Sequence, residues 1–396
     1  MRRPLLHLSH TDIRYDSRIL KEINSLERLV GCDIIAFGIE VHEGASASTS
    51  SRAAKISISR LYTKALKLLP RGVRYAFNML ELTLKFWIRG VILKPEVVHC
   101  HDTLSLPAGV LIKLLTNCKL IYDAHELESN KNGQSTLLSW ASLFVEKTAW
   151  PLIDLLISVS DSILDWYTNN IGHKKSILVL NSPKIAENST IADHQLSDRE
   201  YFRVLYSIPG DKLIFVYLGI LGTGRSVETL LEVFTSSCID AHIVFIGYGE
   251  YADKISRYSQ TFHNIHFHNP VPHEQVVPLV SSADIGLCLI ENVSLSDYYC
   301  LPNKLFEYCF AGLHVLASDF PEIRRVVNEY GLGMCCNLDP TSVLQAVKLL
   351  IRKPPSPIKS NISLLSWEAQ ADRLVRAYLQ LLSKPLVADD TMSADI

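Results

Sequence analysis

A glycine-rich segment in the second half of the chain, Gly219-Ile-Leu-Gly222-Thr-Gly224-Arg225, has the residue types of an anion site. It lies between an apolar run at 212–218, which predicts a strand, and a periodic run that predicts a helix from Val227. Glycines let the backbone approach a ligand, helix-terminal N–H groups attract anions, and an arginine fork suits phosphate. A phosphate site and a plain turn with a solvated arginine fit this pattern equally well. Gly247 and Gly249 follow the next apolar run and should reach the same sheet edge.

A short helix is predicted at 303–311, between Pro302 and Gly312. Lys304 and Glu307 are three residues apart, so they share its polar face. They form either a surface ion pair or part of a ligand site. In the second interpretation Lys304 contacts phosphate, and Glu307 accepts hydrogen bonds from the vicinal hydroxyls of a ribose.

The first half of the chain carries two clusters of imidazole and carboxylate groups at predicted strand ends. They are His99-Cys-His101-Asp102 and Asp123-Ala-His125-Glu126. Such side chains suit zinc or manganese, so a metal site on His99, His101, Asp123 and His125 is one hypothesis. Structural histidines or a metal-free site are the alternatives. No further histidine or carboxylate series supports a metal, so the metal-free interpretation is favoured.

A polar loop with two arginines precedes the first predicted helix. Asp16 is a candidate cap for that helix. Arg14 and Arg18 would then face a ligand cleft, where they could bind a phosphate or a sugar acid. A plain capping loop is the equal alternative.

Strands and helices alternate along the chain, which is typical of an α/β protein. Apolar runs predict strands in the first half at 5–8, 33–39, 97–100, 120–122, 155–159 and 177–180, and in the second half at 212–218, 242–246, 265–267, 285–289 and 314–317. Amphipathic runs predict helices at 16–30, 227–235, 273–281, 303–311 and 341–352.

This alternation predicts two Rossmann-like, doubly wound domains that face each other across a cleft. The first would span 1–190 and the second 191–365, with a polar linker at 187–200. A helix at 366–384 would cross back to the first domain, and 385–396 would form a disordered tail. In open α/β sheets ligands bind beyond the carboxyl ends of the strands, so the cleft should hold the site.

Composition excludes several other classes of protein. The 396 residues are 48% hydrophobic and 20% charged, with a net charge of −2, so bulk electrostatic binding of nucleic acid is not expected. Nine scattered cysteines without a Cys-x-x-Cys pair indicate a reducing compartment, with the cytoplasm as the default. No segment has the length of a membrane span or the pattern of a signal peptide. The basic amphipathic segment 61–94 favours core packing, with a membrane-facing flank as the alternative.

Taken in order, these segments resemble the retaining glycosyltransferases of family 4 (glycosyl transferases group 1), which have the GT-B fold. The resemblance covers most of the chain and rests on an ordered set of short motifs. They are the Asp16-Ser-Arg-Ile-Leu-Lys-Glu segment, His99-Cys-His-Asp, Tyr122-Asp-Ala-His-Glu, Asn181-Ser-Pro, Tyr217 to Arg225, Phe245 to Gly249, Pro302 to Tyr308, Leu316 to Glu322, and Ser366-Trp-Glu.

The resemblance implies metal-independent transfer of a sugar from a nucleotide-sugar donor, with no cofactor. Arg225 and Lys304 would hold the diphosphate, Glu307 the ribose, and the backbone near Val271 the base, while His125 would lie beside the anomeric carbon. The donor-binding set would include Gly219, Gly222 and Gly247. The acceptor side of the cleft would comprise Arg14, Asp16, Arg18, His101, Asp102, Asp123 and Glu126. Such enzymes suggest a lipid-linked or glycan acceptor. They also suggest surface polysaccharide or lipopolysaccharide synthesis, with peripheral contact with the inner membrane.

The sequence departs from the family pattern at two places on the donor side. Val227, Glu228 and Thr229 stand where a second basic residue is usual, and Lys304 is the candidate replacement. Tyr299 stands where a glutamate is usual, and Asp297 is a weak candidate to replace it. A nucleotide-sugar 2-epimerase, a metal-dependent hydrolase and a catalytically silent scaffold therefore stay as alternatives.

Overall fold

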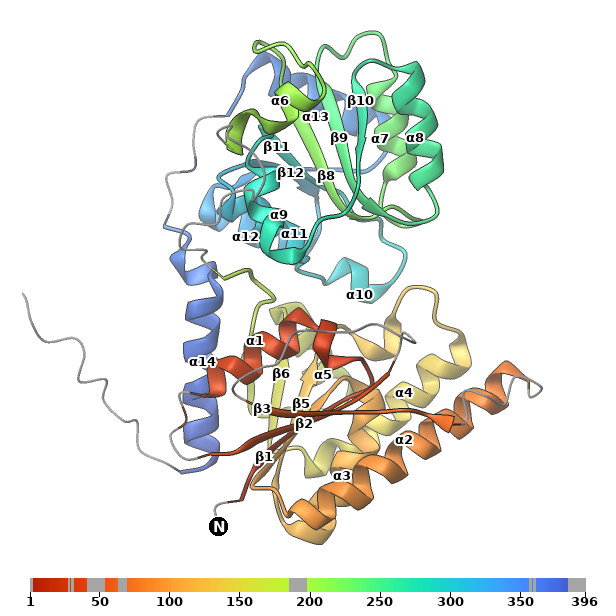
Figure 1. Ribbon diagram of the computed structural model, residues 1–396, viewed down its shortest axis with the longest axis vertical. Helices are drawn as coiled ribbons and strands as arrows, with labels where there is room; N and C mark the ends of the chain where they lie inside the picture. The colour runs from red at the N-terminus through yellow and green to blue at the C-terminus, as the bar shows by residue number, and fades with distance from the viewer. Residues whose placement is uncertain are drawn as a thin grey trace, which may run out of the picture. The chain divides into compact units, whose positions relative to one another are not determined.

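The computed structural model describes residues 3–27, 29, 32–40, 54–62, 70–184, 198–355, 358 and 361–383. The chain divides into two compact units. Unit 1 comprises Met1–Val179 and Gln370–Ile396, and unit 2 comprises Leu180–Ala369. Each unit contains its own parallel sheet with helices on both faces, as Figure 1 shows.

Unit 1 contains a seven-stranded parallel sheet in the order β3-β2-β1-β4-β5-β6-β7. The strands are β1 (Leu5–Ser9), β2 (Ile34–Ile39), β3 (Ala54–Ser59), β4 (Val97–His101), β5 (Lys119–Ala124), β6 (Leu155–Ser158) and β7 (Ser176–Leu178). Valine, isoleucine and leucine dominate the central strands, which are buried on both faces as a parallel sheet requires.

The helices of unit 1 fall on opposite faces of this sheet because right-handed crossovers run in two directions. Helix α1 (Ser17–Leu26) connects β1 to β2, while four helices lead the other way from β3 to β7. These are α2 (Arg71–Leu93), α3 (Leu106–Thr116), α4 (Thr136–Ala149) and α5 (Asp161–Asn170). Helix α14 (Trp367–Leu381) closes the described chain, and its residues from Gln370 onward belong to unit 1.

Unit 2 contains a six-stranded parallel sheet in the order β10-β9-β8-β11-β12-β13, the doubly wound arrangement. Its strands are β8 (Ile214–Ile220), β9 (His242–Tyr248), β10 (Ile265–His268), β11 (Ile285–Cys288), β12 (His314–Ser318) and β13 (Gly333–Cys336). Its helices are α6 (Tyr201–Leu205), α7 (Val227–Phe234), α8 (Ala252–Thr261), α9 (His273–Val280), α10 (Leu295–Tyr298), α11 (Asn303–Phe310), α12 (Pro321–Tyr330) and α13 (Pro340–Arg352). Two apolar clusters pack on the two faces of the sheet.

The predicted architecture of two doubly wound α/β domains is confirmed. The prediction missed the edge strands β3 and β13 and the helices α3, α4, α5, α6, α8, α10 and α12, and its first helix ends at Leu26 rather than residue 30. Most of the predicted linker at 187–200 and the whole tail at 385–396 lie outside the described residues. All nine cysteines are free thiols. No helix in the described part of the chain is long and apolar enough to cross a membrane.

Candidate functional site

Two glutamates that follow neighbouring strands fix the loop between β8 and α7 in unit 2 by hydrogen bonds. The Glu250 carboxylate accepts hydrogen bonds from the Thr223 backbone N–H and hydroxyl, both at 2.7 Å. The Glu291 carboxylate accepts the Ser226 N–H at 2.9 Å, and the Glu291 N–H donates to the Gly224 carbonyl at 3.0 Å. Four polar contacts therefore fix the backbone of the glycine-rich segment before any ligand binds.

Close packing of the backbone, as well as room for a ligand, explains why glycine occupies positions at this edge of the sheet. Gly247 has φ +150°, and a Cβ there would lie 1.8 Å from the Gly219 carbonyl oxygen. A Cβ on Gly249 would lie 2.4 Å from the Leu221 oxygen. Gly219 itself has φ +125°, with open space around the position of a Cβ. Gly247 therefore allows β9 to approach β8, and Gly219 leaves room above the strand end.

Arg225 follows the glycines and points to the short helix α10. Its Nη1 donates to Asp297 Oδ1 at 3.1 Å, and Ser294 Oγ donates to the other oxygen of the same carboxylate at 2.7 Å. Asp297, which the sequence suggested as a weak substitute for a sugar-binding glutamate, is therefore the partner of Arg225 here. Tyr299 follows Asp297 at the end of α10.

Lys304 is a buried cation at the start of α11. Its side chain passes over the ring of Tyr217 on β8, with Nζ 4.0 Å from the ring centroid. The residue is only 9% exposed, and no carboxylate among the described residues lies within ion-pair distance of Nζ. A buried ammonium group with an aromatic face but no anionic partner is suited to accept an anion from outside the protein.

Glu307 lies one turn further along α11 and is 6% exposed. His273 at the start of α9 approaches it, with Nδ1 3.6 Å from Oε1. Cys288 at the end of β11 shows that these groups share one region. Burial raises the pKa of its thiol to about 11, while the charges of Lys304 and Arg225 lower it and that of Glu307 raises it. Unit 2 thus brings Arg225, Lys304 and Glu307 together at the carboxyl edge of its sheet.

This arrangement can bind a polyanion next to a hydroxyl-bearing group. Two cations and a glycine-rich backbone suit a diphosphate, and a buried carboxylate suits a vicinal diol. Val271 lies in the segment between β10 and α9 and packs partly buried against the core. It precedes the start of α9 by two residues.

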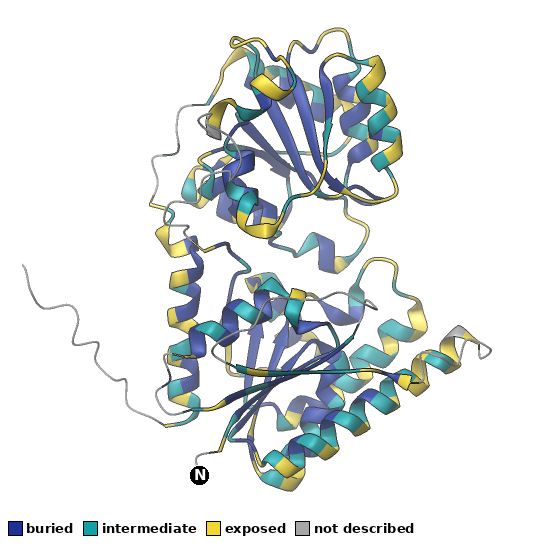
Figure 2. Cartoon of the chain, viewed as in Figure 1, coloured by how far each residue is buried: buried dark blue, intermediate teal, exposed yellow. Residues whose placement is uncertain are grey.

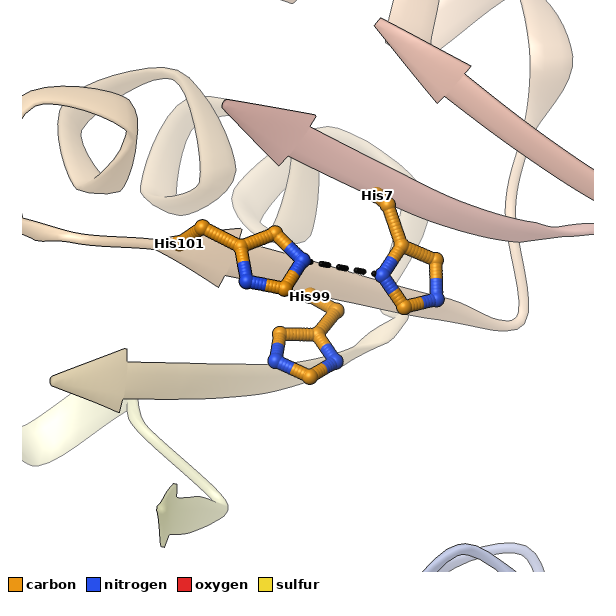
Figure 3. Close-up of side chains that lie close together, drawn as sticks. All are labelled: His7, His99 and His101. Carbon is orange, nitrogen blue, oxygen red and sulfur yellow. Dashed lines mark hydrogen bonds between the residues drawn. The ribbon is translucent and has the colours of Figure 1, made fainter. Parts of the chain in front are cut away.

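In unit 1, strand register brings a second cluster together. His7 on β1 pairs in register with His99 on β4, and His101 pairs with Asp123 on β5, so all four lie on one face of adjacent strands. Figure 3 shows His7, His99 and His101 side by side, with a 3.0 Å hydrogen bond between His7 Nδ1 and His101 Nε2. The His99 and His101 rings stack at 4.3 Å. All four side chains are buried.

His125 is bracketed by two carboxylates. Its Nε2 lies 3.2 Å from Asp123 Oδ2, and its Nδ1 lies 3.7 Å from Asp102 Oδ1. Burial alone would lower the pKa of His125, but the charges of Asp102 and Asp123 raise it to about 10. His99, by contrast, has its pKa lowered to about 3, chiefly by burial. The site therefore contains one charged imidazole among neutral ones.

Arg18 of α1 lies inside unit 1 and completes this charge network. Its Nη2 donates to both oxygens of Asp123, at 3.0 and 3.3 Å, and its Nη1 donates to the Val179 carbonyl at 2.9 Å. Its Nε lies 3.1 Å from Glu22 Oε1 on the same helix. Burial, followed by the charge of Asp123, raises the pKa of Glu22 well above the usual value, while the charge of Arg18 lowers it. Arg18 thus holds the Asp123 carboxylate in place.

Two sets of side chains in unit 1 have the types and spacing of metal ligands. One is His7, His99 and His101, and the other is Glu22, His99, His101 and Asp123, whose donor atoms all lie within 4.8 Å of one another. The four-residue set predicted from the sequence differs, since it had His125 in place of Glu22. Asp123 already accepts from Arg18 and His125, so its charge is balanced within the protein. A dication would have to compete with these two cations for Asp123.

The remaining predicted residues of unit 1 lie at the loop ends around the cluster. Arg14 is paired with Asp12, its Nε and Nη2 donating at 2.9 and 2.7 Å. Asp16 caps α1 by accepting the Ile19 N–H at 3.2 Å, as predicted. Asp102 takes φ +62° at the end of β4, and Glu126 is an exposed side chain 3.7 Å from Lys131 Nζ.

Several residues of both sites were missed in the sequence. Glu22 stands four residues after Arg18, a helical spacing that could have revealed the pair. Glu250 and Glu291 follow predicted strands, which is a weaker signal. Tyr378 of α14 contacts His99 Nδ1 at 2.7 Å, across 279 residues of sequence, and nothing local indicated it.

Comparison with solved structures shows a shared fold along nearly the whole chain. Sucrose-phosphate synthase from Thermosynechococcus elongatus has a TM-score of 0.76 and 16% identity, covering 96% of this chain and 100% of that one. Anabaena HepE in complex with UDP-glucose has a TM-score of 0.68 and 12% identity, with 95% and 99% covered. The lipopolysaccharide outer core galactosyltransferase WaaB has a TM-score of 0.62 and 13% identity, with 96% and 99% covered. No curated protein matches the chain.

These structures define the chain as a protein of the GT-B fold. Residues 212–353, which carry Arg225, Lys304 and Glu307, match the family of glycosyl transferases group 1. This match identifies residues 212–353 as a glycosyltransferase domain of that family, and it bears out the resemblance stated from the sequence.

Proposed function

We propose that this glycosyltransferase works with retention and without a metal ion, and that it transfers the sugar to a glycan or lipid-linked acceptor. The observation that carries the donor half of the proposal is Lys304, a buried cation with no carboxylate partner in the described chain. Its charge, like those of Arg225 and Glu307, acts on the pKa of the Cys288 thiol at the end of β11, which supports a shared donor site. Family members generally need no metal, and these cations can supply the positive charge that a metal would otherwise bring.

On the donor side, Arg225 and Lys304 would bind the diphosphate and stabilise the negative charge that develops as it leaves. Fixed cations of this kind contribute on the order of 3 kcal/mol to a transition state, or about a hundredfold in rate. Glu307 would accept hydrogen bonds from the ribose hydroxyls, and the backbone near Val271 would meet the base. Gly219 and Gly222 would let the loop approach the phosphates, while Gly247 supports them by packing β9 on β8.

On the acceptor side, His125 would lie beside the anomeric carbon as an imidazolium. The carboxylates of Asp102 and Asp123 keep its pKa raised, so it would donate a hydrogen bond to the reacting sugar rather than remove a proton. His101, Arg18 and Asp123 would position it. Arg14, Asp16, Asp102 and Glu126, at the neighbouring loop ends, would face the acceptor. We assign no protein nucleophile, because retention would follow from attack on the same face that the diphosphate leaves.

Two of the similar structures suggest what to test first. The HepE structure holds UDP-glucose, which makes a uridine diphosphate sugar the first donor to try. WaaB is named for lipopolysaccharide outer core synthesis, which supports surface polysaccharide or lipopolysaccharide as the product class. A cytoplasmic enzyme working at the inner face of the inner membrane is the setting that this acceptor class suggests.

The donor site is tested by thermal unfolding of the full chain with UDP, GDP, ADP or CMP, each with and without EDTA. Wild type is compared with Arg225→Ala and with Arg257→Ala, an arginine on α8 outside the proposed site. A ligand at about 100 times its dissociation constant adds about 2.7 kcal/mol to the free energy of unfolding. One diphosphate should raise the melting temperature of wild type and Arg257→Ala, with little effect on Arg225→Ala and no change with EDTA.

Two results would count against this assignment. Equal stabilisation of Arg225→Ala and wild type would remove Arg225 from the donor site. Loss of stability in EDTA, with no response to any nucleotide, would favour the metal hydrolase based on the unit 1 cluster.

A further inference from the structure

Helix α2 of unit 1 exposes a continuous apolar stripe. Large side chains recur along it every three or four residues, and each is between 40% and 74% exposed: Val73, Phe77, Leu80, Leu84, Ile88 and Ile92. The opposite side of the same helix packs on the sheet through Leu82 and Phe86, which are 2% and 0% exposed. Core packing, the interpretation favoured from the sequence, therefore explains only one side of the helix.

Helix α4 carries a second exposed stripe. Leu137, Trp140 and Phe144 are 73%, 63% and 57% exposed, and the two aromatic rings stack at 5.6 Å. Helix α3 contacts both α2 and α4 and adds Leu114 and Leu115, each 62% exposed. Figure 2 shows exposed and half-exposed positions along α2 and α4.

The two stripes lie on the same face of unit 1. Helices α2, α3 and α4 all belong to crossovers that run from β3 towards β7, so right-handed connections place them on one side of the sheet. We call the outer surface of these three helices the α2–α4 face. Eleven large apolar side chains on one face go well beyond the scattered exposed hydrophobics that any soluble surface has.

Basic residues outnumber acidic ones on the described parts of the three helices: Arg74, Lys85, Arg89, Lys113 and Lys147 against Glu81 and Glu146. Lys113 is paired with Asp154, and Arg89 donates to Ser57 and Ser59 of β3. Glu146 is buried beneath the face, and Glu81 is paired with Lys85. Arg74 and Lys147 have no carboxylate partner among the described residues, so their charges are available to an anionic surface.

We propose that the α2–α4 face docks unit 1 on a bilayer that contains anionic lipids. Trp140, Phe144 and Leu137 would enter the interfacial region, the α2 stripe would lie along it, and Arg74 and Lys147 would meet lipid phosphates. Tryptophan is favoured at membrane interfaces, and apolar stripes flanked by basic residues are typical of segments that lie on a membrane. A second copy of the chain fits less well, because two faces of like charge would oppose each other.

This inference does not depend on the donor site, since it concerns one face of unit 1. The test is co-sedimentation of the full chain with vesicles of phosphatidylcholine and phosphatidylglycerol, compared with vesicles of phosphatidylcholine alone. The variant Trp140→Ser/Phe144→Ser removes the aromatic pair. The matched control is Val204→Ser/Leu349→Ser in unit 2, which removes two apolar side chains that are 54% and 52% exposed.

We expect wild type and the unit 2 control to bind the anionic vesicles equally, and the aromatic variant to bind on the order of a hundredfold more weakly. Binding of wild type should fall with added salt and should be weaker on phosphatidylcholine alone. Arg225→Ala should bind vesicles like wild type, so failure of the donor assignment would leave this result unchanged.

The proposal is overturned if wild type stays in solution with both vesicles, or if the aromatic variant binds as tightly as wild type. It is also overturned if wild type is a dimer by sedimentation velocity and the aromatic variant a monomer, with vesicle binding absent from both. That outcome would assign the α2–α4 face to a second copy of the chain. Circular dichroism of both double variants checks that each is folded.

Discussion

His125 is a partly exposed imidazole whose pKa is raised by neighbouring carboxylates. Asp102 and Asp123 approach its two ring nitrogens from different strands, and together they outweigh the cost of burial. Asp123 in turn is neutralised by Arg18, so the network holds two cations and two carboxylates without an external ion. The role proposed for His125 therefore relies on a fixed positive charge rather than on a titrating base near neutral pH.

This charge predicts a stability change in alkaline solution. The pKa of His125 is about 10 in the folded chain and about 6.5 when unfolded, so the folded state binds the proton more tightly. The contribution of His125 to the free energy of unfolding is complete below about pH 6.5 and is lost as the pH rises through about 10. Between about pH 7 and pH 10, the free energy of unfolding, measured with urea, should fall by a few kcal/mol more for wild type than for His125→Gln.

The difference between wild type and His125→Gln isolates the contribution of His125, because every other titrating group is present in both proteins. Equal losses for wild type and His125→Gln would show that His125 is neutral in the folded protein. The imidazolium role proposed for it would then be wrong.

At the scale of elements, the donor loop depends on how closely two strands approach each other. Gly247 is left-handed at φ +150°, and any side chain there would meet the Gly219 carbonyl. Gly247→Ala should therefore lower the free energy of unfolding by at least about 2 kcal/mol and shift Gly219 as well. Gly210→Ala is the matched control, because a Cβ there has nothing within 4 Å and should change stability by under about 0.5 kcal/mol.

Urea unfolding measures both variants, and UDP titration of Gly247→Ala measures the effect on the loop. A Gly247→Ala variant with the stability of Gly210→Ala would mean that β9 can move away from β8 at little cost. The packing explanation for this glycine would then fail.

The central strands and the edge strands β7 and β10 were predictable from the sequence, whereas the edge strands β3 and β13 were not. Central strand β8, Ile-Phe-Val-Tyr-Leu-Gly-Ile, is a continuous apolar run because both of its faces are covered. Edge strand β3, Ala-Lys-Ile-Ser-Ile-Ser, is half-exposed and alternates polar with apolar residues, and β13 begins with glycine. Helix α8 is largely polar, so its period was also weak. Partial burial weakens the run or periodic pattern of apolar residues on which the prediction relied.

Across the whole molecule, the local motifs were visible in the sequence, and their partners were not. Arg225, Lys304 and Glu307 stand next to turns that join a predicted strand to a predicted helix. Their neighbours come from elsewhere, as Asp297 is 72 residues from Arg225 and Tyr217 is 87 from Lys304. Only the parallel sheet, which gathers strand ends at one edge, brings such residues together.

We thus propose a donor site in unit 2 and a membrane-docking apolar face in unit 1. The first belongs to the family domain at 212–353, and the second lies on helices outside it. The two features can be separated by mutation, because no residue is shared between them.

The most direct measurement is calorimetric titration of UDP into the full chain in the presence of EDTA. Wild type is compared with Lys304→Met, which keeps the length of the side chain without its charge, and with Lys353→Met on the exposed end of α13. We predict that wild type and Lys353→Met bind with the same affinity and that Lys304→Met binds roughly tenfold to a hundredfold more weakly. Equal affinity of Lys304→Met and wild type, or no binding by wild type until a divalent cation is added, would contradict a metal-free donor site built on Lys304.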